Sequence, residues 1–351
     1  MLSPMHQFVK DYTHLREKWR RDGDVEAFLA GLREYLVSAA CVEARPIELF
    51  IKGRVALEEG DLDHAELFFD ELLHTQHELE EPGARVIRAW TLFNKALICS
   101  RKGASDDVAA AIYDEMITEL NDAKDPELQE WHATALLEKA DISFRQGRFD
   151  EVIALCDQID IRYRGFEEFE VRKVCARASL SKAQCLADQG EYDQAIMQYD
   201  DFLARFGDSR YDPFDKLTIR VLGYKGESLH RRKRFDEALK SYNDLLERAR
   251  SITGSRIREF AAIASLNKAE ILAAQGNADE AVSILSEIQC SLQDAQEPQF
   301  DKIIALARSK AESLAGRRNK DRFSLRPSVL LRICMRIRTV VRCLRKSVLG
   351  R

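Results

Sequence analysis

The sequence predicts an all-α protein whose helices form a right-handed superhelical solenoid of stacked helix-turn-helix units. Three observations predict it: a helix-favouring composition, a repeat of about 43 residues, and matching residue columns within that repeat. Of the 351 residues, 45% are apolar, 32% are charged and only 7 are proline. Such a chain can bury a core, and its abundant Ala, Leu, Glu, Lys and Arg favour helix over strand.

One position anchors the repeat, because a helix-breaking residue returns there at nearly constant intervals. Successive anchors are 43 or 44 residues apart, and six repeats run from about residue 47 to 292. Glycine occupies every anchor except the fifth: Gly60, Gly103, Gly147, Gly190, Lys233 and Gly276. We expect each repeat to contain a helix, a tight turn at the anchor and a second helix.

Residue types recur at fixed distances from the anchor. A small residue seven positions before it lets the two helices approach closely, at Gly53, Ala96, Ala140, Ala183, Gly226 and Ala269. An aspartate three positions after it is expected to cap or charge-stabilise the second helix, at Asp63, Asp106, Asp150, Asp193, Asp236 and Asp279. Apolar residues five and nine positions after it form the buried stripe of that helix, at Ala65, Val108, Val152, Ala195, Ala238 and Ala281, then Phe69, Ile112, Cys156, Tyr199, Tyr242 and Leu285.

Segments 181–203, 223–246 and 267–288 resemble tetratricopeptide repeats. In the first segment the family's small residue, turn glycine, aromatic residue and alanine correspond to Ala183, Gly190, Tyr192 and Ala195. The family's usual unit has about 34 residues, so the resemblance is to a longer, bacterial variety. The second repeat departs from the pattern, with Ser105 at the aromatic position and Val108 at the alanine position. The resemblance implies a scaffold that binds macromolecules along a concave groove.

Four segments are expected along the chain. Residues 1–46 are predicted to form an N-terminal helical pair that breaks at Gly23 and caps the solenoid, and residues 47–292 the six repeats. Residues 293–315 are predicted to form a C-terminal capping helix, and residues 316–351 a basic amphipathic tail.

The sequence contains none of the motifs that would supply a phosphate cradle, a metal site or a catalytic nucleophile. We therefore expect no enzymatic activity, cofactor, metal or small-molecule substrate. The histidines His64, His74 and His77 are interpreted as ordinary surface residues. The 8 cysteines include no C-x-x-C pair, which favours reduced, buried thiols. Without a signal-peptide pattern or a long apolar run, the expected location is cytoplasmic.

A lysine column is the most regular polar feature of the repeats. It lies eight positions before the anchor, at Lys52, Lys95, Lys139, Lys182, Lys225 and Lys268. One interpretation is structural, with the methylenes covering the edge of the apolar stripe and the charge in water. The other is a ladder of ammonium groups that binds an acidic peptide or a terminal carboxylate.

The C-terminal tail concentrates positive charge. From Gly316 onward there are twelve Lys or Arg residues and one acid, which leaves about −16 on the remainder of a chain whose net charge is −5. Residues 328–349 read as a basic amphipathic helix, whose candidate contact residues are Arg332, Arg336, Arg338, Arg342, Arg345 and Lys346. An anionic membrane surface, a partner's groove, a nucleic acid and the chain's own acidic body are the alternative partners.

Together these features favour an adaptor whose groove binds a protein or peptide and whose tail adds a second contact, at the inner membrane surface or on a partner. A peptide-sensing regulatory protein is one alternative. A nucleic-acid-associated adaptor that binds through the tail is another, although the broad apolar face of the tail makes nucleic acid the less favoured partner.

Overall fold

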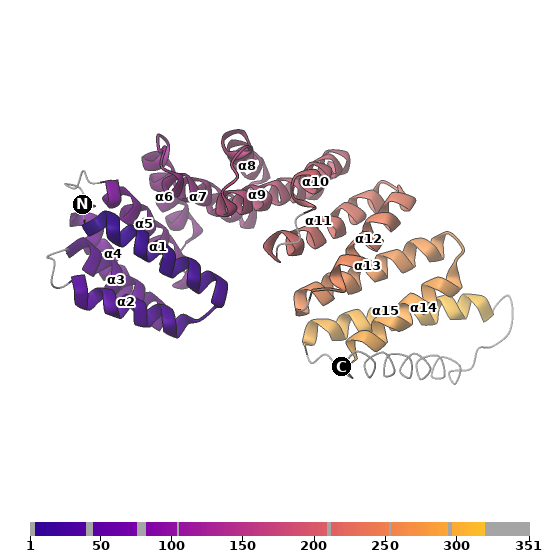
Figure 1. The fold of residues 1–351 in the computed structure, drawn as a ribbon. Helices are drawn as coiled ribbons and strands as arrows, with labels where there is room; N and C mark the ends of the chain where they lie inside the picture. The colour runs from indigo at the N-terminus through magenta and orange to yellow at the C-terminus, as the bar shows by residue number, and fades with distance from the viewer. Residues whose placement is uncertain are drawn as a thin grey trace. The chain divides into compact units, whose positions relative to one another are not determined.

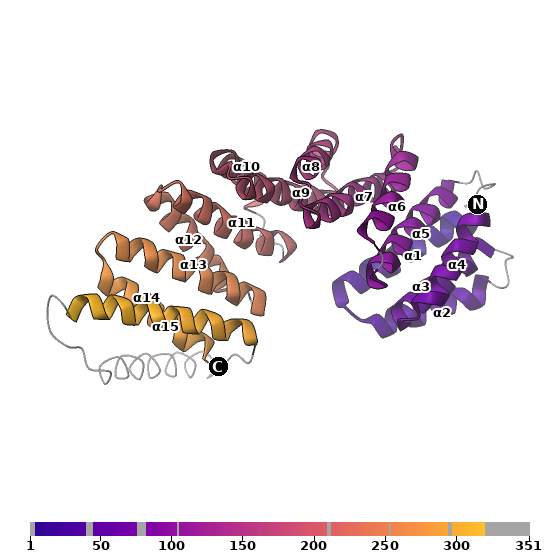
Figure 2. The same ribbon diagram turned by 180° about the vertical axis from the view of Figure 1, so that it is seen from behind.

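A computed structural model describes residues 4–39, 45–75, 82–103, 105–208, 212–252, 254–293 and 297–319. These residues form fifteen helices and no strand (Figure 1, Figure 2), so the all-α prediction is confirmed. No helix in this part of the chain combines the length and the hydropathy that a bilayer crossing requires.

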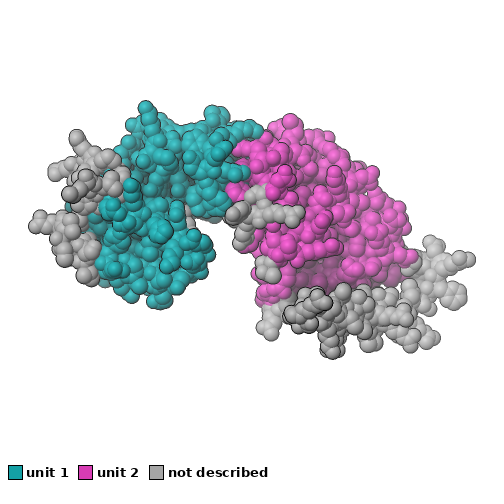
Figure 3. Space-filling model, viewed as in Figure 1, with its two compact units in different colours: residues 1–185 teal, residues 186–351 magenta. Residues whose placement is uncertain are grey.

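The chain divides into two compact units, Met1–Cys185 and Leu186–Arg351 (Figure 3). The helices that begin in unit 1 are α1 (Pro4–Asp22), α2 (Val25–Ala39), α3 (Arg45–Glu59), α4 (Leu62–Thr75), α5 (Pro82–Arg101), α6 (Asp106–Leu120), α7 (Pro126–Arg145), α8 (Phe149–Tyr163) and α9 (Phe169–Asp188). Those of unit 2 are α10 (Tyr192–Phe206), α11 (Asp212–Arg231), α12 (Phe235–Ala249), α13 (Ser255–Ala274), α14 (Ala278–Leu292) and α15 (Pro298–Asn319). The assignment of separate roles to residues 1–46, 47–292 and 293–315 stays a prediction.

Helix length explains why the repeat unit is long. The first helices α5, α7, α9, α11 and α13 each have 20 residues. The second helices α6, α8, α10, α12 and α14 each have 15 residues. The turns between the two helices of a repeat stay short, so most of the additional length lies within the helices.

The anchor position is a left-handed turn. Gly60, Gly103, Gly147, Gly190 and Gly276 have φ between 69° and 89°, a region that a residue with a Cβ atom enters at a cost. Lys233 has φ 59° and is the one non-glycine residue with positive φ in the described part of the chain. The turn geometry therefore persists in the fifth repeat without the residue that favours it.

The small-residue column allows the close helix approach that the sequence predicts. A Cβ atom placed on Gly53 would lie 2.5 Å from the ring of Phe69, and one on Gly226 would lie 2.5 Å from the ring of Tyr242. In both repeats the aromatic ring comes from the second helix and packs directly on the backbone of the first. The core between these helices consequently requires glycine on one side and an aromatic residue on the other.

The second repeat corrects one expectation. Val108 is 49% exposed, whereas Ala109 and Tyr113 are buried at 1% and 5%. The buried stripe of α6 is therefore shifted by one residue from the predicted Val108 and Ile112. The reason is one additional residue in the turn after Gly103, where the Ser105 side chain accepts a hydrogen bond from the Asp107 amide and begins the helix.

The aspartate column lies in the first turn of each second helix, where negative charge favours the helix dipole. The helices α8, α10, α12 and α14 begin without a side-chain cap hydrogen bond. Some of these aspartates also join neighbouring repeats. Lys102 contacts Asp63 at 2.6 Å, and Arg145 contacts Asp106 at 2.7 Å.

Five cysteines lie in the described part of the chain, and none of them forms a disulfide with another. Cys99, Cys156, Cys175 and Cys185 are buried, and Cys290 is partly buried. Burial raises the pKa of the Cys156 thiol, which keeps it protonated and unreactive. The expectation of burial is confirmed for Cys99, Cys156, Cys175 and Cys185, whereas Cys41, Cys334 and Cys343 lie outside the described part.

Candidate binding surfaces

The lysine column forms ion pairs between neighbouring repeats. Four of its lysines contact an aspartate 25 residues earlier, on the second helix of the preceding repeat: Lys95–Asp70, Lys139–Asp114, Lys182–Asp157 and Lys225–Asp200. The Nζ–Oδ1 distance is 2.6 Å in the second pair and 2.5 Å in the third and fourth. Lys268 donates to the Asn243 amide oxygen at 2.8 Å instead. Lys52 contacts Glu48 of its own helix at 2.5 Å.

These lysines lie partly within the packed edge of the repeats. In the four pairs the lysine side chains are 17–23% exposed and the aspartates 43–56% exposed. The methylenes cover apolar surface and each ammonium group faces a carboxylate. The column therefore links repeats electrostatically, and its use as a ladder for an acidic ligand stays a prediction.

The aspartate partners of this column have a sequence signal that the residue columns above did not include. They lie ten residues after the anchor, or eleven in the second repeat with its longer turn: Asp70, Asp114, Asp157 and Asp200. The same position holds Asn243 in the fifth repeat and Ser286 in the sixth. The aspartate partner is thus present in the first four repeats and is replaced by a neutral residue in the last two.

A pocket of about 360 Å³ lies on the first helices of the last two repeats, and we call it the α11–α13 pocket. The helix α11 contributes Gly223, Tyr224 and Glu227, and α12 contributes Tyr242. The helix α13 contributes Arg256, Glu259, Phe260, Ile263, Ala264 and Asn267. Because Gly223 has no side chain, the space between the two first helices stays open there.

The α11–α13 pocket combines an apolar wall with charged groups. The Tyr224 and Phe260 rings meet edge to face at 5.9 Å, and Ile263 is 41% exposed. Below them the Asn267 amide donates to the Tyr242 hydroxyl at 3.3 Å, and burial raises the pKa of Tyr242. The carboxylates of Glu227 and Glu259 and the guanidinium of Arg256 complete the lining.

Comparison with protein families identifies the repeats. Two models described as tetratricopeptide repeat match residues 175–251 and 224–296. Residues 175–296 of the chain are tetratricopeptide repeats. The matched residues include all of α11, α12 and α13, so the α11–α13 pocket lies within tetratricopeptide repeats. None of the curated proteins matches the sequence of this chain.

Several solved structures are similar to this chain. The apo form of RapI is 10% identical, with 88% of this chain and 87% of that chain covered and a TM-score of 0.58. A tetratricopeptide repeat protein from Parabacteroides merdae is 14% identical over 85% of this chain and 99% of that one, with a TM-score of 0.46. Cut9 in its complex with Hcn1 is 14% identical over 86% of this chain and 53% of that one, with a TM-score of 0.45. The likeness to RapI shows the fold.

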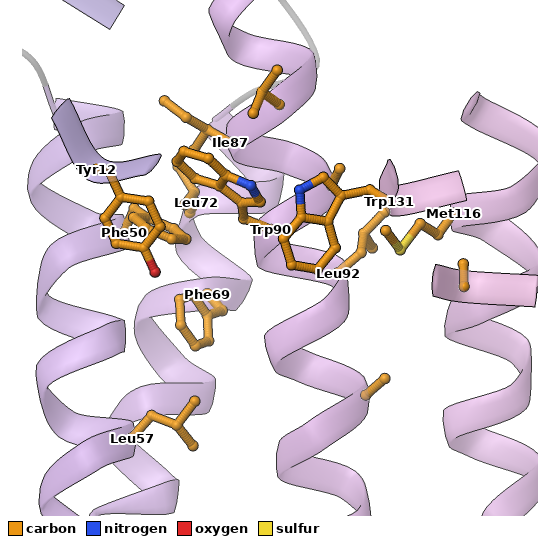
Figure 4. Packing of buried hydrophobic residues seen from close by; sticks show 14 of the residues in the cluster. Tyr12, Phe50, Leu57, Phe69, Leu72, Ile87, Trp90, Leu92, Met116 and Trp131 are labelled. Carbon is orange, nitrogen blue, oxygen red and sulfur yellow. The ribbon is translucent and has the colours of Figure 1, made fainter. Parts of the chain in front are cut away.

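The helical repeats of unit 1 carry larger side chains at the positions that form the α11–α13 pocket. Phe93 lies ten residues before Gly103, as Gly223 lies ten before Lys233. Trp131 lies sixteen residues before Gly147, as Phe260 lies sixteen before Gly276. The Phe93 and Trp131 rings meet at 5.0 Å. Figure 4 shows Trp131 beside Trp90, with Tyr12 of α1 on the other side of Trp90.

A second pocket in unit 2, of about 570 Å³, is polar and lies by α10, α11 and α12. Its arginine is already engaged, because Arg248 contacts Asp215 at 2.9 Å and donates to the Gly207 carbonyl at 2.6 Å. The acidic residues Asp208, Asp244 and Glu247 complete its charged lining. This pocket is built around an internal ion pair.

The remaining predicted residues lie apart from these surfaces. His64 contacts Asp61 at 2.7 Å, and His74 contacts the Asp70 carbonyl at 3.0 Å, whereas His77 lies outside the described residues. Within the described ranges no three His, Cys, Asp or Glu side chains gather as metal ligands would. The tail residues Arg332, Arg336, Arg338, Arg342, Arg345 and Lys346 also lie outside the described part of the chain.

Proposed function

We propose that this protein is a non-enzymatic adaptor that binds a peptide segment of a partner protein in the α11–α13 pocket. The observation that carries the proposal is a pocket between two first helices whose apolar wall consists of the partly buried Tyr224 and Phe260 and the exposed Ile263. The volume of the α11–α13 pocket, about 360 Å³, falls within the range of about 300–1,000 Å³ that ligand sites commonly have. The proposal assigns neither a reaction nor a cofactor to the pocket.

The chemistry of the pocket indicates the kind of segment. The apolar wall would receive one aromatic or branched aliphatic side chain as an anchor. Glu227 and Glu259 favour a basic residue beside that anchor, and Arg256 favours a carboxylate. A short segment with an apolar anchor between a base and an acid satisfies all three groups.

The binding test uses the full-length protein and a displayed pool of random peptides. Selection should enrich peptides that carry an apolar anchor flanked by charge. The variant Ile263→Asp places a carboxylate on the apolar wall, and we expect it to weaken these peptides about tenfold or more, the loss expected when a buried anchor contact is removed. The matched control is Ile161→Asp, because Ile161 is 85% exposed on α8 in unit 1. Equal binding to both variants would place the peptide elsewhere.

The tail supplies the second contact of the proposed adaptor. Six basic residues alternate with an apolar stripe over residues 328–349, a pattern typical of helices that lie on anionic bilayers. The test is co-sedimentation of the full-length chain with vesicles of phosphatidylserine and phosphatidylcholine, against phosphatidylcholine alone. Changing Arg336, Arg338 and Arg342 to Gln should release the protein from the anionic vesicles. Salt-independent binding to both vesicle types would contradict the charge-based contact.

The buried thiols support a reducing compartment, so we place the adaptor in the cytoplasm. A peptide-sensing regulator would bind its peptide in the same pocket. It would differ from an adaptor only in the response that peptide binding causes. A nucleic-acid adaptor would instead bind RNA or DNA through the tail with a steep salt dependence. Adding nucleic acid to the vesicle assay distinguishes that alternative, since it would then compete for the tail.

A further inference from the structure

The helix α1 lies on the first helices of the repeats that follow it. It packs along α5, and Figures 1 and 2 both show the two helices side by side. Tyr12 of α1 reaches the rings of Phe50 on α3, at 5.1 Å, and Trp90 on α5, at 4.5 Å (Figure 4). We call the surface formed by Phe50, Trp90 and Trp131 the α3–α7 face. The helix α1 thus covers a surface made by three successive first helices.

Arg16 fixes α1 at the α7 end of this face. Its side chain is 6% exposed, and its guanidinium carbon lies 5.0 Å from the Trp131 ring centre and 5.9 Å from that of Trp90. The Nη2 atom lies 3.7 Å from Glu127 and 3.5 Å from Glu130. The guanidinium is therefore held between two indole rings and two carboxylates.

The contact between α1 and the α3–α7 face leaves polar atoms without partners. Among the described residues, the buried Nε and Nη1 atoms of Arg16 and the indole nitrogens of Trp90 and Trp131 have no hydrogen-bond acceptor. Burial also raises the pKa of Glu127, although Arg16 and the Thr13 hydroxyl oppose the shift. Buried donors in a fixed core are nearly always satisfied. The indole nitrogens of the α3–α7 face therefore retain hydrogen-bonding capacity that α1 does not use.

The connection between α1 and α2 is a two-residue turn, and the Trp19 and Phe28 rings of the two helices stack beside it at 5.0 Å. Only Gly23 and Asp24 separate the two helices, and Gly23 has φ 70° with open space around it. The Asp24 carboxylate accepts from the Ala27 amide at 2.9 Å, which caps α2 independently of α1. A rotation at Gly23 that breaks this ring contact would uncover the α3–α7 face, whereas the Asp24 cap of α2 would remain.

We propose that the α3–α7 face is a docking groove for an amphipathic helix of a partner protein, and that α1 is its resident, exchangeable occupant. The partner helix presents two aromatic residues and an arginine at four-residue intervals, as Phe8, Tyr12 and Arg16 do. Glu127 and Glu130 select the arginine, and the unpaired indole N–H groups of Trp90 and Trp131 donate hydrogen bonds to polar groups of the incoming helix. The site differs from the α11–α13 pocket in position and in chemistry.

The test measures exchange in the full-length chain. The probe is a labelled synthetic peptide of residues 4–22, which stands in for the partner helix. The variant Arg16→Ala weakens the resident α1 and should bind the probe about tenfold more tightly than the wild type, the factor expected when a charge-assisted contact in the competitor is lost. A probe with Arg16→Glu should bind neither protein.

Arg21→Ala is the matched control, because Arg21 also lies on α1 but its side chain is 71% exposed. It should bind the probe as weakly as the wild type. Adding Glu130→Gln to the Arg16→Ala chain should remove most of the gained affinity. Equal affinity of the Arg16→Ala and Arg21→Ala chains for the probe would overturn the proposal.

Hydrogen exchange of the wild-type chain provides an answer that does not depend on how the variants fold. We expect α1 amides to exchange faster than those of α3 and α5, and to exchange faster still when the probe is added. If α1 exchanges no faster than α3 and α5, it is a fixed part of the core and the proposal fails. A dimer of the wild-type chain held together by exchanged α1 helices would overturn the commitment to a separate partner.

Discussion

Two pairs of first helices occupy equivalent places in the repeat pattern, one in repeats 2 and 3 and one in repeats 5 and 6. The surface of the first pair is filled by side chains, whereas that of the second pair contains an open pocket. In unit 1 the rings of Phe93 and Trp131 fill the space, and α1 covers the tryptophan. In unit 2 Gly223 and Phe260 stand at those positions and leave the α11–α13 pocket. The repeat pattern fixes where side chains meet, and their size decides whether a surface is filled or open.

The largest difference between the two surfaces is expected when Trp131 in unit 1 and its equivalent, Phe260 in unit 2, are each truncated to alanine. Trp131→Ala should lower the free energy of unfolding by about 3–5 kcal/mol, because Trp131 is buried and removing it leaves a cavity. Phe260→Ala should lower it by about 1 kcal/mol, because Phe260 lines an open pocket and is only partly buried. Guanidinium denaturation followed by circular dichroism measures both. Equal losses would mean that both surfaces are core.

His132 should give unit 1 an acid sensitivity that the equivalent position in unit 2 cannot supply. Burial lowers its pKa to about 4, and its Nδ1 atom lies 2.9 Å from the Tyr163 hydroxyl. The unfolded chain, with an ordinary histidine pKa near 6.5, takes up a proton as the pH falls below that value, whereas the folded chain does not. The stability that neutral His132 contributes is therefore present above about pH 6.5 and is lost toward pH 4.

Between about pH 7 and pH 5 this loss should reach about 2 kcal/mol. His132→Gln keeps a polar group beside Tyr163 but does not titrate, so it should remove this part of the pH dependence. The equivalent residue in unit 2 is Ala261, which cannot titrate. Denaturation of both chains at each pH gives the difference directly. Parallel pH profiles for wild type and variant would exclude His132 as the source.

The turns of the two units offer a smaller and reciprocal test. Lys233→Gly should raise the free energy of unfolding by about 1 kcal/mol, because Lys233 holds the left-handed conformation with φ 59°. Gly147→Lys in unit 1, where φ is 71°, should lower it by about the same amount. Thermal melts of the two variants against the wild type check the signs. A destabilised Lys233→Gly chain would show that the lysine side chain has a compensating contact.

The smallest expected effect concerns the lysine column. Lys139→Met should cost about 0.5 kcal/mol at low salt and less at high salt, because Lys139 faces Asp114 at 2.6 Å in a partly exposed pair. Lys268→Met should change stability very little, since its partner is the neutral amide of Asn243. A salt series on both variants tests this difference. Identical salt responses would mean that the ion pairs add nothing to the link between repeats.

The sequence predicted the features that depend on short-range pattern. Helical pairs, tight turns at the anchors and the close approach at Gly53 and Gly226 all follow from residues within one repeat. The single-residue shift in the second repeat was not predicted, because an additional turn residue moves the stripe from Val108 to Ala109 without changing the composition.

Features that join distant residues were harder to predict. The Lys–Asp pairs could have been found by extending the column analysis to the tenth residue after the anchor, and Gly223 stands out beside Phe93 once the repeats are aligned. The contact of Thr13 with Glu127, at 3.0 Å, joins residues 114 positions apart. No local sequence pattern predicts a contact over that separation. The position at which α1 packs could therefore be found only in the structure.

The length of the first helices has a consequence for the size of what can bind. At about 1.5 Å per residue, a 20-residue helix is about 30 Å long, so successive first helices form a surface about 30 Å high. The helix α1, with 19 residues, extends over nearly the same distance. A ligand that matches this surface end to end is a helix of about five turns, whereas an extended peptide would match it with about nine residues. The length of the repeat thus determines how long a partner helix must be to cover the whole surface.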